Sequence, residues 1–436
     1  MTGRAKIIEI IKSIIIVILI VTAIMLSYSV WFYGERGVLS GIFSPRQEPA
    51  KIYEMYEESA YTLSVISPLR LSIRNDLGLY HSSSFDASSR ANSRTIFESL
   101  SPILGEALAN GSAPVQVTNT DWDKAISGRM VLLDFEGDIP LWCVCAALNV
   151  TPATDVDFSA RYIIMYINDR STVDILYKSD AGHIYKSNSN TGATYLSSIM
   201  ADYLPNGSYF PAEIPSTSAA PAEFAALFDM PSFYSLTPYN FLEELSSLDA
   251  GKATDNILLS FGFNPYTAKS YTESDGIKVY VEDFNTLRIY PDGYLTYYSP
   301  EADELPGVDI SDGKKVSLLG EAGRICQSIP AYSGGVSVYV LRAYFNDDTG
   351  RFVILLGSEY NTIPILNEKG SCAKFEYKNA KLVSAELSLI SLRASKTNTQ
   401  ILPVTQAIAA SSNGEKLDEL GLYYSSDGVV RWLYSR

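Results

Sequence analysis

One long apolar run lies near the N-terminus, and the rest of the chain alternates short apolar and polar segments. Residues 13–31 (SIIIVILIVTAIMLSYSVW) carry no charged side chain. An α-helix rises about 1.5 Å per residue, so this run would span roughly 28 Å, close to the thickness of a bilayer's hydrocarbon core. The pattern predicts a single transmembrane helix over residues 13–33, followed by a large body on one side of a membrane.

The charges around this run predict its orientation. Arg4, Lys6 and Lys12 precede it, and only Glu9 opposes them. Because Lys and Arg favour the cytoplasmic side, we expect residues 1–12 to be cytoplasmic and the body to be extracytoplasmic, in a cell-membrane protein that crosses the bilayer once. Aromatic side chains, which favour the headgroup region, gather at the far end of the run, at Tyr28, Trp31, Phe32 and Tyr33.

A cleaved signal peptide is the alternative, since Val21-Thr22-Ala23 resembles a small-residue cleavage site. The apolar run continues well past Ala23, which favours an uncleaved anchor. Ala23 and Ser27, with Thr22 beside them, form a small-x-x-x-small pattern that allows two helices to approach closely in lipid. These three residues are our candidates for helix–helix interaction, and a plain anchor without such contacts is the other interpretation.

Beyond a linker at residues 34–50, the apolar spacing predicts an α+β body. Asp-Gly turns between alternating aromatic and β-branched residues are strong hairpin signals, and a helix followed by an antiparallel meander occurs more than once. We expect helices at 86–109 (with Pro102 breaking or kinking the middle), 239–248, 314–328 and 404–420. We expect strands at 61–75, 130–135, 161–168, 173–178, 270–273, 278–282, 286–290, 294–298, 336–345, 351–358, 373–377 and 382–392, with a closing hairpin at 423–434.

Composition suggests several folded domains. Residues 205–231 are rich in Pro, Ala and Ser, which is the clearest internal boundary signal. We predict an N-terminal ectodomain over 51–235, a central α+β domain over 236–312 and a C-terminal α+β domain over 313–436. The net charge is −15, and an acidic body is a poor candidate for binding nucleic acid.

The chain has four cysteines, too few for a disulfide-dense scaffold. Cys143 and Cys145 lie in an apolar stretch, and on a strand both would point to one face. An i, i+2 pair has poor geometry for a mutual bridge, so we interpret them as buried free thiols. Cys326 and Cys372 could form a disulfide, because both belong to the C-terminal region.

The sequence contains no recognisable catalytic set, so we predict no catalytic residue, no metal site and no cofactor. His81 and His183 are far apart, and neither has a metal ligand at a suitable spacing. Phosphate-binding glycine loops and hydrolase motifs are absent. Acidic pairs that could serve glycoside hydrolysis or bind calcium occur at Asp134/Glu136, Glu282/Asp283 and Asp347/Asp348.

Several stretches resemble one known family. In the first half these are SPLR (67–70) leading to Tyr80, WDKAISG (122–128), MVLLDF (130–135) and DIPL (138–141). The most specific block contains GFNP (262–265), YTESDG (271–276), VYVE (279–282) and LRIYPDGYLTY (287–297). The end contains LPVTQAI (402–408) and LYY (422–424) through Trp432. The chain resembles the YycH and YycI (WalH and WalI) family in these stretches.

This resemblance implies a non-enzymatic, single-pass membrane protein. Members of the family regulate the YycG (WalK) two-component sensor kinase, which controls cell-wall metabolism in Firmicutes. The implied partners are a sensor histidine kinase and a sister single-pass regulator. The family acts through transmembrane-helix contacts, and the resemblance does not carry over the sign of regulation.

Two other classes of function remain open from the sequence. The first is an extracytoplasmic module that binds a ligand or the cell wall and has no signalling role. The second is a cell-wall hydrolase that uses paired carboxylates, which would require an Asp/Glu pair converging in a cleft about 5 to 9 Å apart.

Overall fold

The computed structural model describes residues 64–435 except 76, 85–88, 153–157, 228–231, 241, 243–246, 330–334 and 368. The predicted transmembrane helix at 13–33, with Thr22, Ala23 and Ser27, lies outside the described residues, as does the linker at 34–50. Among the residues that are described, no helix has the length and apolar character needed to cross a membrane.

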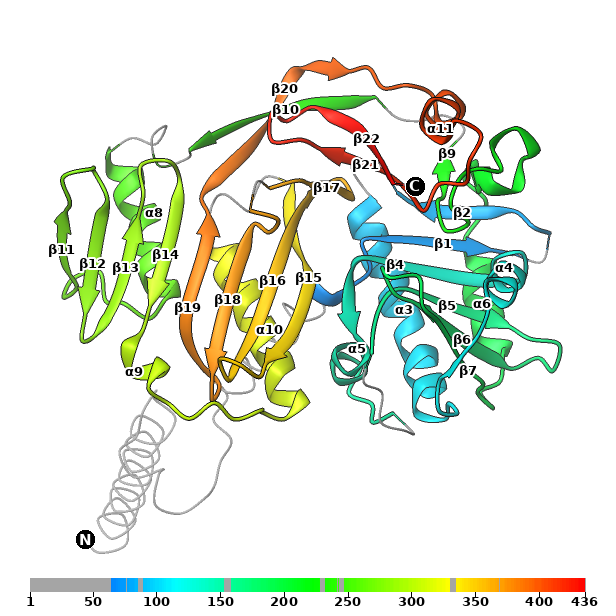
Figure 1. The fold of residues 1–436 in the computed structure, drawn as a ribbon, viewed down its shortest axis with the longest axis horizontal. Helices are drawn as coiled ribbons and strands as arrows, with labels where there is room; N and C mark the ends of the chain where they lie inside the picture. The colour runs from blue at the N-terminus through cyan, green and yellow to red at the C-terminus, as the bar shows by residue number, and fades with distance from the viewer. Residues whose placement is uncertain are drawn as a thin grey trace, which may run out of the picture. The chain divides into compact units, whose positions relative to one another are not determined.

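The first half of the body is an antiparallel sheet with helices on both faces (Figure 1). The sheet order is β2–β1–β4–β5–β6–β7, and the strands predicted at 161–168 and 173–178 are confirmed as the hairpin of β5 and β6. The strands are β1 (Arg70–Arg74), β2 (Tyr80–Ser83), β4 (Met130–Pro140), β5 (Ser159–Ile167), β6 (Val173–Lys178) and β7 (Ile184–Ser187). Helix α3 (Ser89–Ala109) packs on one face and α4 (Asn119–Ile126) on the other.

The second half repeats one plan, a helix followed by an antiparallel meander. Helix α8 (Ser247–Ser260) precedes β11 (Lys269–Thr272), β12 (Lys278–Glu282), β13 (Asn285–Ile289) and β14 (Tyr294–Tyr298). Helix α10 (Asp312–Ser328) precedes β15 (Val336–Asn346), β16 (Arg351–Tyr360), β18 (Ala373–Lys378) and β19 (Lys381–Ser388). The two meanders join through β14 and β19. The predicted α+β class and the repeated order of elements are therefore confirmed.

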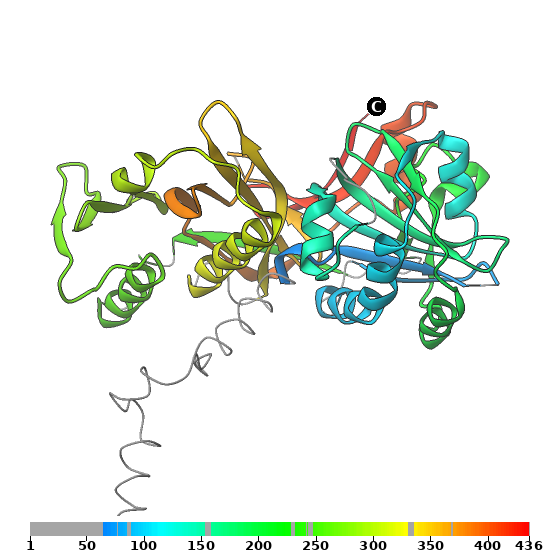
Figure 2. The same cartoon turned by 90° about the horizontal axis from the view of Figure 1, so that it is seen from below.

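One hydrophobic core runs beneath both halves. Alternate residues of the strands, such as Val131 and Leu133 on β4 and Val338 and Val340 on β15, point into this core because successive strand residues face opposite sides. Apolar faces of α3, α8, α10, α5 (Leu141–Ala147) and α6 (Thr194–Asp202) cover these residues. Figure 2 shows the blue helix α3 and the yellow helix α10 on the same side of the strands.

Two predicted helices have different limits. Tyr239 belongs to β10 (Phe233–Asn240), which pairs along its length with β20 (Ile390–Thr399), and this cross-strand pairing outweighs the local helical pattern predicted for 239–248. The helix predicted over 404–420 is α11 (Val404–Ser412). It ends there because Asn413 and Gly414 have positive φ angles of 47° and 87°, a left-handed conformation that terminates helices.

The cysteine-containing run also differs from a strand, since it forms helix α5 directly after β4. Cys143 and Cys145 are buried free thiols, as predicted. Cys326 and Cys372 are free as well, so the disulfide that we considered is absent. Pro102 does not interrupt α3, although it lacks the backbone N–H that an interior helix residue donates, and it lies on the exposed side of the helix.

A third group of elements contacts both halves. It contains β17 (Ile363–Ile365), the closing hairpin of β21 (Glu419–Tyr424) and β22 (Val430–Ser435), and the ribbon of β10 and β20. Buried residues from the Pro-rich segment, including Phe224 and Ala226, share a second hydrophobic cluster with Leu422 and Tyr424. The domain limits predicted at 235 and 312 stay a prediction.

The two sheets meet where β4 passes beside β15. Arg342 and Asp138 form a parallel bridge there. A Cβ atom on Gly137 would lie 2.3 Å from the carbonyl oxygen of Leu341, so only glycine permits this approach of the two backbones.

We predict that Gly137→Ala destabilises the protein by about 2 kcal/mol, because β4 and β15 must separate to admit the methyl group. The free energy of unfolding, measured by urea titration of the purified protein, checks this. Gly192→Ala is the matched control, since a Cβ at Gly192 would meet nothing within 4 Å. Equal stability of the two variants would contradict the close contact.

Candidate functional site

The acidic pair Asp134 and Glu136 lies at the centre of a buried polar network. Both residues belong to β4, whose register against β5 shifts between Asp134 and Ile139. Glu136 has a positive φ of 66°, and irregularities of this kind re-aim side chains next to functional sites. The backbone N–H of Glu136 donates to Asp134 Oδ1 at 3.0 Å, which holds the two carboxylates together.

Two arginines from neighbouring strands neutralise this pair. Arg70 of β1 donates through Nε to Asp134 Oδ2 at 2.8 Å and forms an ion pair with Glu136. Arg161 of β5 lies 3.4 Å from Glu136 Oε2 through Nη2, and 3.7 Å from Asp134 Oδ1 through Nε. All four side chains are largely buried, with exposed fractions between 6% and 13%.

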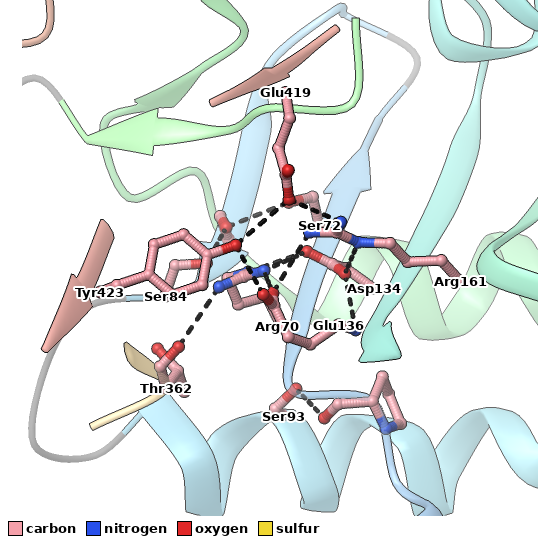
Figure 3. A network of polar contacts seen from close by, with 12 residues as sticks. Arg70, Ser72, Ser84, Ser93, Asp134, Glu136, Arg161, Thr362, Glu419 and Tyr423 are labelled. Carbon is pink, nitrogen blue, oxygen red and sulfur yellow. Dashed lines mark hydrogen bonds and ion pairs between the residues drawn. The ribbon is translucent and has the colours of Figure 1, made fainter. Parts of the chain in front are cut away.

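The far C-terminal strands complete the network (Figure 3). The Tyr423 hydroxyl donates to Glu136 Oε1 at 2.8 Å, and Glu419 accepts a hydrogen bond from Arg161 Nη1 at 2.8 Å. Arg70 Nη1 reaches the backbone carbonyl of Thr362 at 3.4 Å. These partners lie more than 250 positions along the chain from the groups that they contact, so the network joins β1, β4 and β5 to the end of the chain.

Thr362 lies in a strained turn between β16 and β17. Asn361 and Thr362 both have positive φ angles, 54° and 65°, which define a two-residue hairpin turn that usually contains glycine. A β-branched residue rarely adopts this conformation. The carboxylate of Glu359 accepts a hydrogen bond from the Thr362 N–H at 2.7 Å, and Arg70 contacts its carbonyl. Buried charges on both sides therefore hold the turn in place.

Electrostatics keep Asp134 ionised. Burial alone would raise the pKa of Asp134, but the charges of Arg70 and Arg161 and the hydrogen bonds that it accepts lower that pKa below its ordinary value. Burial and the nearby charge of Glu136 raise the pKa of Tyr423, so its hydroxyl stays protonated and donates. Because neither group exchanges protons near neutral pH, Asp134 and Tyr423 are poorly suited to general acid–base chemistry.

The network forms one wall of a cleft of about 500 Å³. Further charged groups lie along this wall, including Asp180 in the β6–β7 turn and a Lys178–Glu223 ion pair. Burial raises the pKa of Asp180 to about 6, with a further rise from Asp138 that the adjacent Arg161 partly offsets. The opposite wall comes from β15, β16, β17 and the loop after β17, and it includes Tyr339, Leu341, Ile365 and Leu366.

Other chemical candidates from the sequence do not form sites. Within the described part of the chain, no three His, Cys, Asp or Glu side chains gather closely enough to hold a metal ion. His81 contacts the carbonyl oxygen of Leu204 through Nδ1, and His183 is exposed. Glu282 accepts hydrogen bonds from Asn264 and Thr267, and Asp347/Asp348 lie exposed in the β15–β16 turn.

The sequence pointed to the carboxylate pair but not to its partners. Arg70 and Arg161 each lie within a strand whose neighbouring residues are mostly apolar, and a charge in such a strand can be buried only when it is paired. That pattern is a usable signal for a buried ion pair. Nothing in the local sequence identifies Glu419, Tyr423 or Thr362 as the other members.

We predict that Asp134→Asn lowers the free energy of unfolding by about 3–5 kcal/mol at pH 7, because it leaves two buried guanidinium groups short of a counterion. The folded-state pKa of Asp134 lies below the ordinary value of 3.8, so its contribution is present above that value and is lost as the pH falls through the lower folded pKa. Urea titrations at pH 7 and pH 3 measure the difference. Asp347→Asn, in an exposed turn, is the matched control.

A stability difference below about 0.5 kcal/mol at pH 7 between the Asp134→Asn and Asp347→Asn variants would contradict the buried network.

Among known proteins, the chain is similar to solved structures. No protein-family model and no curated protein sequence matches the chain. The crystal structure of YycH from Bacillus subtilis matches with a TM-score of 0.49 and 11% identity, over 86% of this chain and 94% of that one. The crystal structure of an uncharacterized protein from Eubacterium rectale matches with a TM-score of 0.28 and 11% identity, over 44% of this chain and 71% of that one.

Proposed function

We propose that this protein is a non-enzymatic, membrane-anchored regulator of a sensor histidine kinase that controls the cell wall. The transmembrane helix at 13–33 would contact the kinase and a sister single-pass regulator, with the body outside the cell. The support comes from the motifs shared with the YycH and YycI family, from the uncharged apolar run, and from the chemistry of the buried network.

The observation that carries the non-enzymatic part is the pairing of Asp134 and Glu136 with two arginines. Glycoside hydrolysis by a carboxylate pair needs one carboxylic acid that stays protonated near neutral pH. The lowered pKa of Asp134 is the opposite of what that role requires. The arrangement favours a structural and binding role over hydrolysis of a wall polymer.

We predict that Ala23→Leu and Ser27→Leu change kinase output by at least about twofold, because a larger side chain prevents close approach of a partner helix. The amount of phosphorylated response regulator in cells measures the output. Ser27→Leu keeps the run apolar, and Val17→Leu, a similar change outside the small-residue pattern, is the control. Unchanged output in both test variants would favour the ligand- or wall-binding module instead.

A photoreactive residue at Ser27 identifies the helix beside the anchor directly. Crosslinking to a sensor histidine kinase or to a second single-pass protein is the expected result. Crosslinking to lipid alone, at Ser27 and at neighbouring faces of the helix, would count against the proposal.

A further inference from the structure

Negative charge exceeds positive charge along the charged wall of the cleft. Lys178 and Glu223 form a pair, which leaves the network of two arginines and four carboxylates. Asp180 and Glu419 both contact a single nitrogen, Nη1 of Arg161, at 3.3 and 2.8 Å. They are also the most exposed carboxylates of the network, at 45% and 30% of their side chains. The uncompensated charge therefore faces the cleft.

Strand β15 contributes a tyrosine side chain to the cleft. Tyr339 lines the cleft, is only 3% exposed, and finds no hydrogen-bond partner among the described residues. Its ring packs over Gly357, where a Cβ atom would lie 2.7 Å from the tyrosine oxygen. Because Tyr339 lines the cleft and its hydroxyl makes no hydrogen bond within the described chain, that hydroxyl is available to a ligand there.

Apolar side chains also line the cleft. Leu366, after β17, is 43% exposed, and Leu433, on β22, is 38% exposed. Leu341 and Ile365, both half-buried, line the same cleft. Binding pockets commonly combine an apolar lining with a few polar groups that fix the ligand's orientation.

We propose that the cleft binds an organic cation that carries an apolar group. The cation would lie against Asp180 and Glu419, the Tyr339 hydroxyl would bond a polar atom of the ligand, and the apolar part would contact Leu366 and Leu433. An arginine or lysine next to an apolar residue in a peptide has this chemistry, and so does a small alkyl amine. This inference goes beyond the kinase-regulator proposal and does not depend on it.

Isothermal titration calorimetry on the purified full-length protein tests the proposal without any kinase. The probes are N-acetyl-arginyl-leucinamide, n-hexylamine and, with reversed charge, N-acetyl-glutamyl-leucinamide. We expect at least one cationic probe to bind with a dissociation constant below about 1 mM. Tighter binding of the peptide would identify a protein segment as the source, and tighter binding of the amine a small molecule.

Two variants locate the binding in the cleft. Asp180→Asn/Glu419→Gln should weaken binding of the cation at least about tenfold, since it removes the charges that attract it. Asp347→Asn/Asp348→Asn, in the exposed β15–β16 turn, makes the same change in net charge and should leave the affinity unchanged.

The second test variant, Tyr339→Phe, separates a binding role from a structural one. Because the hydroxyl has no partner within the described chain, its removal should leave the melting temperature unchanged or raised, while it weakens binding severalfold. The proposal is overturned if no cationic probe binds, if the glutamyl peptide binds equally well, or if the Asp180/Glu419 and Asp347/Asp348 variants lose the same affinity. These results leave the crosslinking test at Ser27 unaffected, so the two proposals fail separately.

Discussion

The fold depends on buried ion pairs and hydrogen bonds that join β1, β4 and β5 to the last strands of the chain. Arg70 and Arg161 each contact both Asp134 and Glu136, and each also reaches a group beyond residue 360. Removing charges from water costs several kcal/mol for each ion, so none of these groups is stable in this position without the others. The network therefore requires the two ends of the body to come together in one arrangement.

Members of the same network also line a cleft. Because the arginines are already occupied by Asp134 and Glu136, they do not fully neutralise the carboxylates at the edge of the cleft. The strained turn at Thr362, held by Arg70 and Glu359, positions β17 and the loop after it across from that charged wall. The cleft is lined by both charged and apolar side chains, a combination that is common in ligand pockets.

Local patterns were enough to predict most strands of the meanders but not the network. Asp-Gly turns and alternating residues located the β11–β14 meander and the closing hairpin, because those signals act over a few residues. The predicted start of the helix at 239–248 was wrong, because Tyr239 and Asn240 belong to β10, and a local window does not detect the pairing of β10 with the distant β20. The acidic pair Asp134/Glu136 is visible in the sequence because its two members are close neighbours along the chain. Glu419 and Tyr423 are far from that pair in the sequence, so no local pattern identifies them as partners. The apolar anchor, with Thr22, Ala23 and Ser27, stays a prediction.

A double-mutant cycle between Glu136 and Tyr423 tests the central claim most directly, since these residues are separated by 287 positions and meet in one hydrogen bond. Glu136→Gln and Tyr423→Phe keep the shape of each side chain, and the free energies of unfolding of both single variants and the double variant give the coupling energy. The account predicts a favourable coupling of about 1–3 kcal/mol, as expected for a buried hydrogen bond to a charged group. Additive effects within about 0.3 kcal/mol would contradict a network that joins the two ends of the body.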